Sequence, residues 1–247
     1  MYKHILFIIF AILLSSCQRS SPNGETHYAS MNRVDQAKQQ KEEGLIAKLA
    51  AKGIATDQVH ILLRAFKVDK QLEVWAKNKT DDTYKKIISY EFCKLSGEAG
   101  PKRKQGDLQV PEGMYHIDRF NPKSKFFLSL GINYPNASDK ILGDQKQPGG
   151  DIFIHGKCVT VGCIPITDPM IMELYILALK AKTNGQNKIQ VQIFPTFMEG
   201  KWLEKVQIKY PKHFAFWEEL RVFYEAFEQN HQEIDFSILD DGSYLIQ

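Results

Sequence analysis

Alternating hydrophobic and polar residues dominate the first half of the chain. This period of two predicts strands that are separated by turn residues. The predicted ranges are 60–67, 71–76, 84–95, 110–117 (a turn that leads into a strand) and 126–132. Asp69 and Lys70 lie between the first two ranges and predict that these strands form a hairpin.

The second half of the chain mixes helical and strand periods. Apolar residues at helical spacing follow Asp168 and Pro169, which suit the N-cap and the first position of a helix. An Asn-Gly pair at 184–185 ends this helix. The other predicted elements are a loop over 139–150, a strand over 188–195, a helix over 211–229 and a short hairpin over 236–246 with an Asp-Gly turn.

One more helix is predicted before the first strand. Residues 36–52 are charged and helix-forming, with Leu45, Ile46 and Leu49 on one side, and Gly53 ends the pattern. We therefore expect an N-terminal amphipathic helix within the segment 36–58. Because turns and short loops join most strands, the sheet is expected to be antiparallel or mixed. The pattern as a whole predicts an α+β fold with a β-rich core and capping helices.

The first residues have the pattern of an export signal. Lys3 and His4 precede an uninterrupted apolar run from Ile5 to Leu14, which is about half of the roughly 20 residues that a membrane-spanning helix needs. The sequence Leu-Ser-Ser before Cys17 resembles the lipobox of bacterial lipoproteins. That resemblance implies a signal peptide over 1–17 and lipidation of Cys17. Residues 18–35 are rich in Ser, Asn, Gln and Gly and are expected to form a flexible tether. A plain secretory signal with an incidental Cys17 is the alternative.

An exported chain of this kind would work in the cell envelope, as a membrane-anchored lipoprotein that faces the periplasm. The net charge of +3 is small, and no basic stripe is interleaved with aromatic residues. We therefore do not expect nucleic acid as a partner.

Three cysteines remain after Cys17, namely Cys93, Cys158 and Cys163. An odd number in an oxidising compartment leaves at least one free thiol. Cys93 lies in an apolar-polar alternation and is expected to be a small buried hydrophobic residue. The other two cysteines lie in the stretch 151–168, which begins as a strand and then delivers a histidine.

This stretch has the composition of a thiol nucleophile and its base. Cys163 follows Gly162 in a tight turn, whose backbone N–H groups can stabilise an oxyanion. His155 lies eight residues upstream at a strand end and is the natural base, and Gly156 after it allows an unusual backbone conformation. Two alternatives stay open: a metal site made of His155, Cys158 and Cys163, and a permanent or reversible disulfide between Cys158 and Cys163.

At these residues the sequence resembles the L,D-transpeptidase family with the YkuD-type catalytic domain, in its shorter YafK-like branch. The family pattern of a strand ending in His-Gly, then Ser or Thr, any residue, Gly and Cys, is matched by His155-Gly156 and by the residues from Thr160 to Cys163. The family segment Pro-x-Gly-x-Tyr-x-Ile is matched by residues 111–117. The segments 127–130 and 133–136 are also similar to that branch. The resemblance covers about residues 59–195.

The resemblance implies a β-sandwich-like catalytic domain over 59–197 and a C-terminal helical extension with a short hairpin over 198–247. It implies attack of Cys163, with His155 as base, on a peptide bond in the stem peptide of peptidoglycan. An amine or water then accepts the acyl group, and no metal or organic cofactor is required. Hydrolysis that releases peptidoglycan-linked protein or peptide is an alternative, as is a non-catalytic peptidoglycan-binding lipoprotein.

The chain departs from the family pattern at two positions. Val161 stands where many relatives have histidine, and Pro165 where many have arginine. Binding of a substrate carboxylate would then come from elsewhere, and Lys157 and Arg119 are the candidates.

The remaining site predictions concern residues near the motif. Gly156, Thr160 and Gly162 are predicted to orient the site or hold the oxyanion. Thr160 would bond His155 or the substrate, or else serve a local turn. His116 is a half-exposed strand histidine or a substrate contact, and Tyr134 packs or, with Asn133, lines a groove. For the Lys-Arg-Lys triplet at 102–104, we expect simple solvation.

Overall fold

The structure, a computed structural model, describes residues 32–247, apart from the side chains of residues 201–203 and 207. The predicted signal peptide, the lipidation site Cys17 and tether residues 18–31 lie outside the described residues. Within the described part of the chain, no helix is both long enough and apolar enough to cross a membrane. Residues 32–247 form one compact unit.

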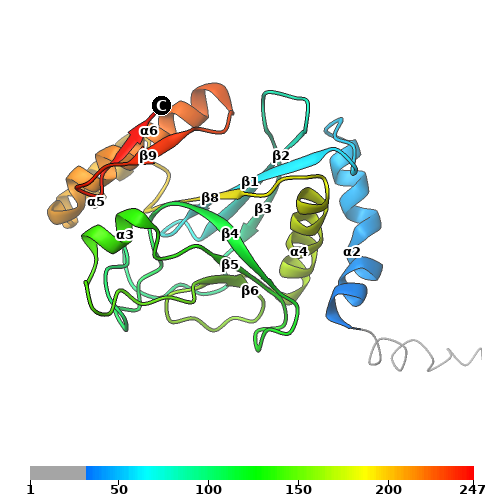
Figure 1. Ribbon diagram of the computed structural model, residues 1–247, viewed down its shortest axis with the longest axis horizontal. Coiled ribbons are helices and arrows are strands. Elements are labelled where there is room, and N and C mark those ends of the chain that lie inside the picture. The colour runs from blue at the N-terminus through cyan, green and yellow to red at the C-terminus, as the bar shows by residue number, and fades with distance from the viewer. Residues whose placement is uncertain (1–31) are drawn as a thin grey trace, which may run out of the picture. The chain divides into compact units, whose positions relative to one another are not determined.

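A single eight-stranded mixed sheet organises this unit (Figure 1). Its strands are β1 (Val59–Phe66), β2 (Gln71–Asn78), β3 (Lys85–Glu91), β4 (Gly113–Asn121), β5 (Ser129–Ile132), β6 (Phe153–His155), β7 (Ile164–Pro165) and β8 (Ile189–Phe194). The spatial order is β3-β2-β1-β8-β4-β5-β6-β7. The β1/β8 and β6/β7 pairs are parallel, and the other pairs are antiparallel. The predicted mixed sheet and the α+β class are therefore confirmed.

The sheet curls until its two edges approach each other. Just beyond the end of β3, the Cys93 N–H donates to the carbonyl of Pro165 in β7, at 3.1 Å. One continuous, curled sheet thus produces the sandwich-like arrangement that the sequence predicted. This curl brings the segment after β3 beside the strands that carry His155 and Cys163.

Helices cover both faces of the sheet. They are α2 (Arg33–Ala50), α3 (Ala137–Leu142), α4 (Asp168–Thr183), α5 (Gly200–Lys209), a 3-10 turn (Pro211–His213) and α6 (Phe214–Asn230). Figure 1 shows α2 and α4 side by side, and the C-terminal hairpin of β9 (Phe236–Ile238) and β10 (Tyr244–Ile246) next to α6. The predicted tail hairpin is confirmed by the antiparallel β9/β10 pairing.

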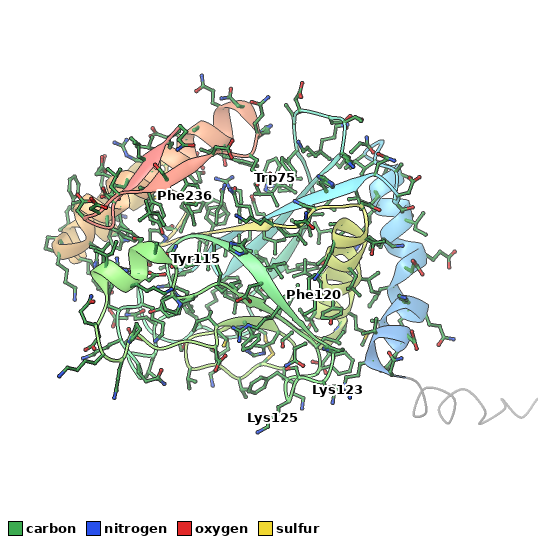
Figure 2. The ribbon with its side chains drawn as sticks, in the orientation of Figure 1. Trp75, Tyr115, Phe120, Lys123, Lys125 and Phe236 are labelled. Atoms are coloured by element: carbon green, nitrogen blue, oxygen red, sulfur yellow. A yellow bond between two sulfur atoms is a disulfide. The ribbon has the colours of Figure 1, made fainter. Side chains whose placement is uncertain are left out.

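The central strand β8 separates two hydrophobic cores. Its alternation predicts one buried face, but all six residues are buried. Val191 and Ile193 pack in the core that contains α4, whereas Phe194 packs with Phe66 and Trp217 in the core that contains α6. In Figure 2, Phe120 lies toward α4, and its ring makes an edge contact with Tyr175 of that helix. A strand covered on both faces loses the solvent-facing side that alternation would indicate.

Two element predictions need correction, and one helix was missed. The predicted loop 139–150 begins inside α3, because Asn136 and Asp139 form a capping box that starts the helix. The tether does not extend to residue 35, because Asn32 caps α2 by accepting the N–H groups of Val34 and Asp35. The sequence pattern also missed α5, whose N-cap residue makes no side-chain cap bond.

Candidate active site

His155 and Cys163 come from neighbouring parallel strands. Ile154 pairs with Ile164 and His155 with Pro165, so Cys163 lies just before β7 and opposite the start of β6. Regular strand spacing and rise would put the Cα atoms of His155 and Cys163 roughly 8 Å apart. Within residues 32–247 no hydrogen bond joins the imidazole to the thiol. The fold therefore makes them close neighbours without a hydrogen bond between them.

The His155 imidazole is buried and oriented by its own backbone. Its side chain is almost inaccessible, at 1% exposure. Its Nδ1 atom lies 2.5 Å from the Gly156 carbonyl oxygen, which can only accept a proton. Nδ1 therefore carries the hydrogen and Nε2 keeps its lone pair. The centre of the Phe126 ring lies 4.6 Å from the centre of the imidazole ring. Burial lowers the pKa of His155, so the imidazole is neutral at neutral pH.

Cys163 is the free thiol among the cysteines of the described chain. Its half-buried sulfur lies 3.6 Å from the Asp151 carbonyl oxygen. Burial raises the pKa of the Cys163 thiol most strongly, the Phe153 N–H and Lys102 lower it, and the Asp151 charge raises it. The thiol is thus protonated at neutral pH, and a nucleophilic reaction would require a base to remove its proton.

The turn before Cys163 is held by Thr160. The Thr160 hydroxyl donates to the Cys163 carbonyl at 2.7 Å and accepts the Gly162 N–H at 3.2 Å. Of the two roles considered for Thr160, the structure shows the local turn. The Gly162 N–H is thereby occupied, whereas the Cys163 N–H donates to no group in the described part of the chain. Gly162 has φ of +131°, and a Cβ there would lie 3.0 Å from the Gln109 carbonyl oxygen.

The turn after His155 is anchored to the start of α4. Lys157 has φ of +60°, a left-handed conformation that is uncommon for non-glycine residues. Its N–H donates to the Asp168 carboxylate at 2.8 Å. Asp168 was predicted to be the helix cap, but Thr167 occupies that position. A Cβ on Gly156 would lie 2.5 Å from the same Asp168 oxygen, so a lack of space requires glycine.

The cysteine pairing differs from both sequence predictions. Cys93 forms a disulfide with Cys158, with a Cα–Cα distance of 5.5 Å. Cys93 is exposed rather than buried, and the alternative disulfide between Cys158 and Cys163 is wrong because Cys158 is already paired. The same bond removes Cys158 from the candidate metal ligands. Among residues 32–247, no group of three or more His, Cys, Asp or Glu side chains is arranged to hold a metal ion.

Arg119 reaches the site across the sheet. It is in register with Gly131 on β5, which is in turn in register with Phe153 on β6. The guanidinium lies 4.8 Å from the centre of the Phe153 ring and donates to the Asp151 carboxylate at 2.8 Å. Asp151 is the residue whose carbonyl contacts the Cys163 sulfur. The ammonium group of Lys157, the other candidate, instead donates to the Lys125 carbonyl at 3.2 Å.

His116 and Tyr134 lie in different surroundings. Tyr134 is buried and donates to the Pro148 carbonyl at 2.9 Å, so this ring packs within the protein. His116 is half-buried on β4, where its N–H donates to the Asn133 side chain at 2.7 Å. Both His116 and Asn133 line a cavity of about 570 Å³, which Tyr134 does not line.

One buried charge near the candidate site was missed because it was assigned to solvent. Lys102 is 4% exposed, and its ammonium group pairs with Asp107 at 2.6 Å. This charge lowers the pKa of the Cys163 thiol. The next residue, Arg103, pairs with Asp139. The prediction that the triplet 102–104 is simply solvated is therefore wrong for its first two members, since a local charge run does not reveal which residues fold inward.

Comparison with known proteins gives one close sequence relationship. The chain is 33% identical over 188 residues to "Putative L,D-transpeptidase YafK" of Escherichia coli (strain K12), an alignment that covers 75% of this chain and 73% of that protein. The same protein from Escherichia coli O157:H7 matches equally. No protein-family model matches the chain. The chain belongs to the L,D-transpeptidase family, as the His-Gly and Gly-Cys motifs predicted.

Two solved structures are also similar to parts of the chain. The helical cell shape determining protein Pgp2 from Campylobacter jejuni has 20% identity and a TM-score of 0.45, with 73% of this chain and 74% of that chain covered. Bd1075 from Bdellovibrio bacteriovorus has 22% identity and a TM-score of 0.40, covering 57% and 50%.

Proposed function

We propose that this protein is a cell-envelope cysteine acyl-transfer enzyme that acts on the stem peptides of peptidoglycan. Family membership supports the class of reaction. The observation that carries the residue assignment is the pairing of Cys93 with Cys158, which leaves Cys163 as the free thiol beside the strand of His155.

The protonation states of the two side chains fit a general-base mechanism. Burial raises the pKa of Cys163 and lowers that of His155, so a neutral thiol meets a neutral imidazole. His155 Nε2 takes the thiol proton as the sulfur attacks the peptide carbonyl carbon. The resulting tetrahedral adduct collapses as the C–N bond breaks, and the His155 proton passes to the leaving amine. This leaves a thioester on Cys163.

The oxyanion of the tetrahedral adduct needs donors that are free. The Cys163 N–H meets this condition, whereas the Gly162 N–H already donates to Thr160. We therefore assign the Cys163 N–H as an oxyanion donor and Gly162 and Thr160 as the residues that shape its turn. Gly156 positions His155 through the close approach of Asp168.

Arg119 is the residue we propose for the substrate carboxylate. It carries a guanidinium beside Phe153 and Asp151, both of which adjoin Cys163. Family members with arginine soon after the cysteine carry that charge at the position of Pro165, which lies on β7 in this chain. A guanidinium binds a carboxylate with two parallel hydrogen bonds. Lys157 adds positive charge at the rim of the site.

The second half of the reaction transfers the acyl group to an amine or to water. An amine would give a crosslink, whereas water would hydrolyse the same class of bond and release peptide or protein from peptidoglycan. The sequence before residue 32 supports a location in the cell envelope, where a lipid on Cys17 would anchor the enzyme to a membrane and the enzyme would face the periplasm. Replacement of Cys17 by serine should release the protein from the membrane fraction.

The test is digestion of purified sacculi followed by muropeptide analysis. The wild-type protein should change the muropeptide profile, and Cys163→Ala and His155→Ala should leave it unchanged. Gly150→Ala is the matched control, because a Cβ at Gly150 meets nothing within 4 Å. Full activity of Cys163→Ala would overturn the assignment. A protein that binds sacculi but never alters them would instead indicate the non-catalytic lipoprotein.

A further inference from the structure

A groove of about 570 Å³ lies beside the C-terminal hairpin, and Cys163 is not among the residues that line it. Its walls come from β4, the start of α3 and strand β9, which Figure 1 shows next to one another. We call it the β9 groove. Its lining includes the side chains of His116, Lys140, Lys188, Asp235 and Ile238.

The free edge of β9 faces this groove. In the β9/β10 ladder, the Leu239 N–H donates to Ser243 and the Gln247 N–H donates to Asp235. In an antiparallel ladder, hydrogen-bonded pairs alternate with non-hydrogen-bonded pairs, so Ser237 is the next residue of β9 that bonds to β10. Phe236 and Ile238 therefore direct their N–H and C=O groups away from β10.

The opposite edge of the hairpin agrees with this pattern. The Tyr244 N–H, on β10, points away from β9 and donates to Glu219 at 3.2 Å. On the β9 side, the outward N–H and C=O groups of Phe236 and Ile238 make no hydrogen bond within the described residues. Phe236, labelled in Figure 2, is half-buried, and its ring packs against Phe223 and Tyr244.

A free strand edge of this kind is usually protected by a proline or a charge. The strand Phe236-Ser237-Ile238 carries neither. It is instead recessed behind the residues of β4 and α3. A recessed edge with outward backbone groups two residues apart fits one extended chain, which can add as a strand. The strand of a second folded copy would have to enter the groove together with its own sheet.

The charges of the groove define the partner further. The ammonium groups of Lys140 and Lys188 and the carboxylate of Asp235 pair with no other side chain within residues 32–247. Glu233, also in the wall, accepts a hydrogen bond from Tyr84 at 3.3 Å. Both signs of charge therefore remain available along one groove. This complements an extended peptide that carries both acidic and basic side chains.

The groove also lies on the strand that carries Arg119. His116 in its wall is three residues from Arg119 along β4, a separation of about 10 Å. A chain bound along β9 would thus pass near the proposed substrate site.

We propose that the β9 groove binds an extended polypeptide segment of mixed charge by β-strand addition. The bound segment belongs to a protein that the enzyme joins to peptidoglycan or releases from it, an assignment that rests on the proposed function. Stem peptides contain D-residues and branched links, which fit a strand ladder poorly. The groove would therefore recognise the protein part of the substrate, while Cys163 and His155 act on the stem peptide.

Amide exchange tests the binding without any need for catalysis. The probe is an acetylated octapeptide with the repeat Lys-Val-Glu-Val, added to the Cys163→Ala protein. Exchange at Phe236 and Ile238 should slow by roughly tenfold or more. Ile238→Pro removes one outward N–H and should abolish the protection. Ile246→Pro is the matched control, because Ile246 directs its N–H from the opposite edge of the same hairpin.

Three outcomes would overturn the binding proposal. These are no protection by the peptide, equal protection by its N-methylated form, and protection that depends on protein concentration in the absence of peptide. The last outcome would mean that a second copy occupies the edge.

Sacculi then test the link to catalysis. On sacculi that carry bound protein, Ile238→Pro should lower product formation by roughly fivefold, and on the same sacculi after protease trimming it should match the wild type. An equal loss on both substrates would overturn recognition of the protein part. If the wild-type protein has no activity on either substrate, the proposed function fails instead. Amide exchange would then still test whether the β9 groove binds peptide.

Discussion

Cys93 and Cys158 are joined across 65 residues of sequence, and their disulfide ties the end of β3 to the loop between His155 and Cys163. The Cys93 N–H also donates to Pro165, two residues after the free thiol. The loop between the proposed nucleophile and base is therefore fastened to the opposite edge of a curled sheet. The disulfide has a structural position, and the chemistry is left to Cys163.

Removal of this disulfide should lower stability and disturb the site. For a loop of this length, the chain-entropy relation gives about 4 kcal/mol, and measured losses are roughly 2–5 kcal/mol. The double variant Cys93→Ser/Cys158→Ser should lose stability in that range, measured by denaturant unfolding, and should have lower activity. Cys163→Ser should retain the stability and lose the activity. A double variant with unchanged stability and activity would show that the bond does not hold the loop.

Gly156→Ala should be destabilising because of space alone. Its Cβ would lie 2.5 Å from the Asp168 carboxylate and 2.9 Å from the Phe126 carbonyl, next to His155. Overpacking of this kind lowers the free energy of unfolding by roughly 1–3 kcal/mol. Gly150→Ala, in the same region, should change it by less than about 0.5 kcal/mol, because nothing lies within 4 Å. Thermal and denaturant unfolding of the two variants would check this, and similar losses in both would contradict the steric argument.

The pH dependence of kcat/KM should have an acidic limb centred below pH 6.5. Burial lowers the pKa of His155 from 6.5, so the imidazole stays a neutral base down to the lowered value and is lost as a base below it. The contribution of His155 to the free energy of unfolding follows the same direction with pH. It is fully present above the pKa of the unfolded chain and is lost as the pH falls through the lowered pKa of the folded state.

Asp139 provides the control for the pH profile, because burial raises the pKa of this carboxyl to about 6. Asp139→Asn should keep the acidic limb if His155 is responsible. Disappearance of the limb in that variant would assign it to Asp139, and a limb centred above pH 6.5 would contradict the role of a neutral imidazole.

Arg119→Ala should raise KM by roughly tenfold and change kcat little, because the guanidinium binds a carboxylate that does not react. Arg119→Lys should restore only part of the binding, since lysine lacks the two-pronged geometry. Asp151→Asn frees the guanidinium from its exposed ion pair and should leave KM unchanged or slightly lower. Steady-state kinetics on purified muropeptides would check these values. An Arg119→Ala enzyme with an unaltered KM would exclude the arginine from substrate binding.

Local pattern was sufficient for most elements of the fold. The hairpin of β1 and β2, helix α4 and the terminal hairpin all follow from residues close in sequence. The candidate pair His155 and Cys163 was also accessible, because eight residues and one turn separate them. Prediction from the sequence was weaker at element ends: the side chains of Asn32 and Asn136 cap α2 and α3, and Thr167 takes the N-cap position of α4 without a side-chain cap bond.

The sequence by itself predicted the class of this protein, its candidate thiol and the strands that flank it, because periodicity and motif spacing are local properties. Only the tertiary structure decided that Cys93 pairs with Cys158, that Lys102 is buried against Asp107, and that Arg119 reaches Asp151. Each of these contacts joins segments that the order and curl of the sheet bring together. Strand order arises from the packing of two cores against the sheet, and no local pattern of residues encodes it.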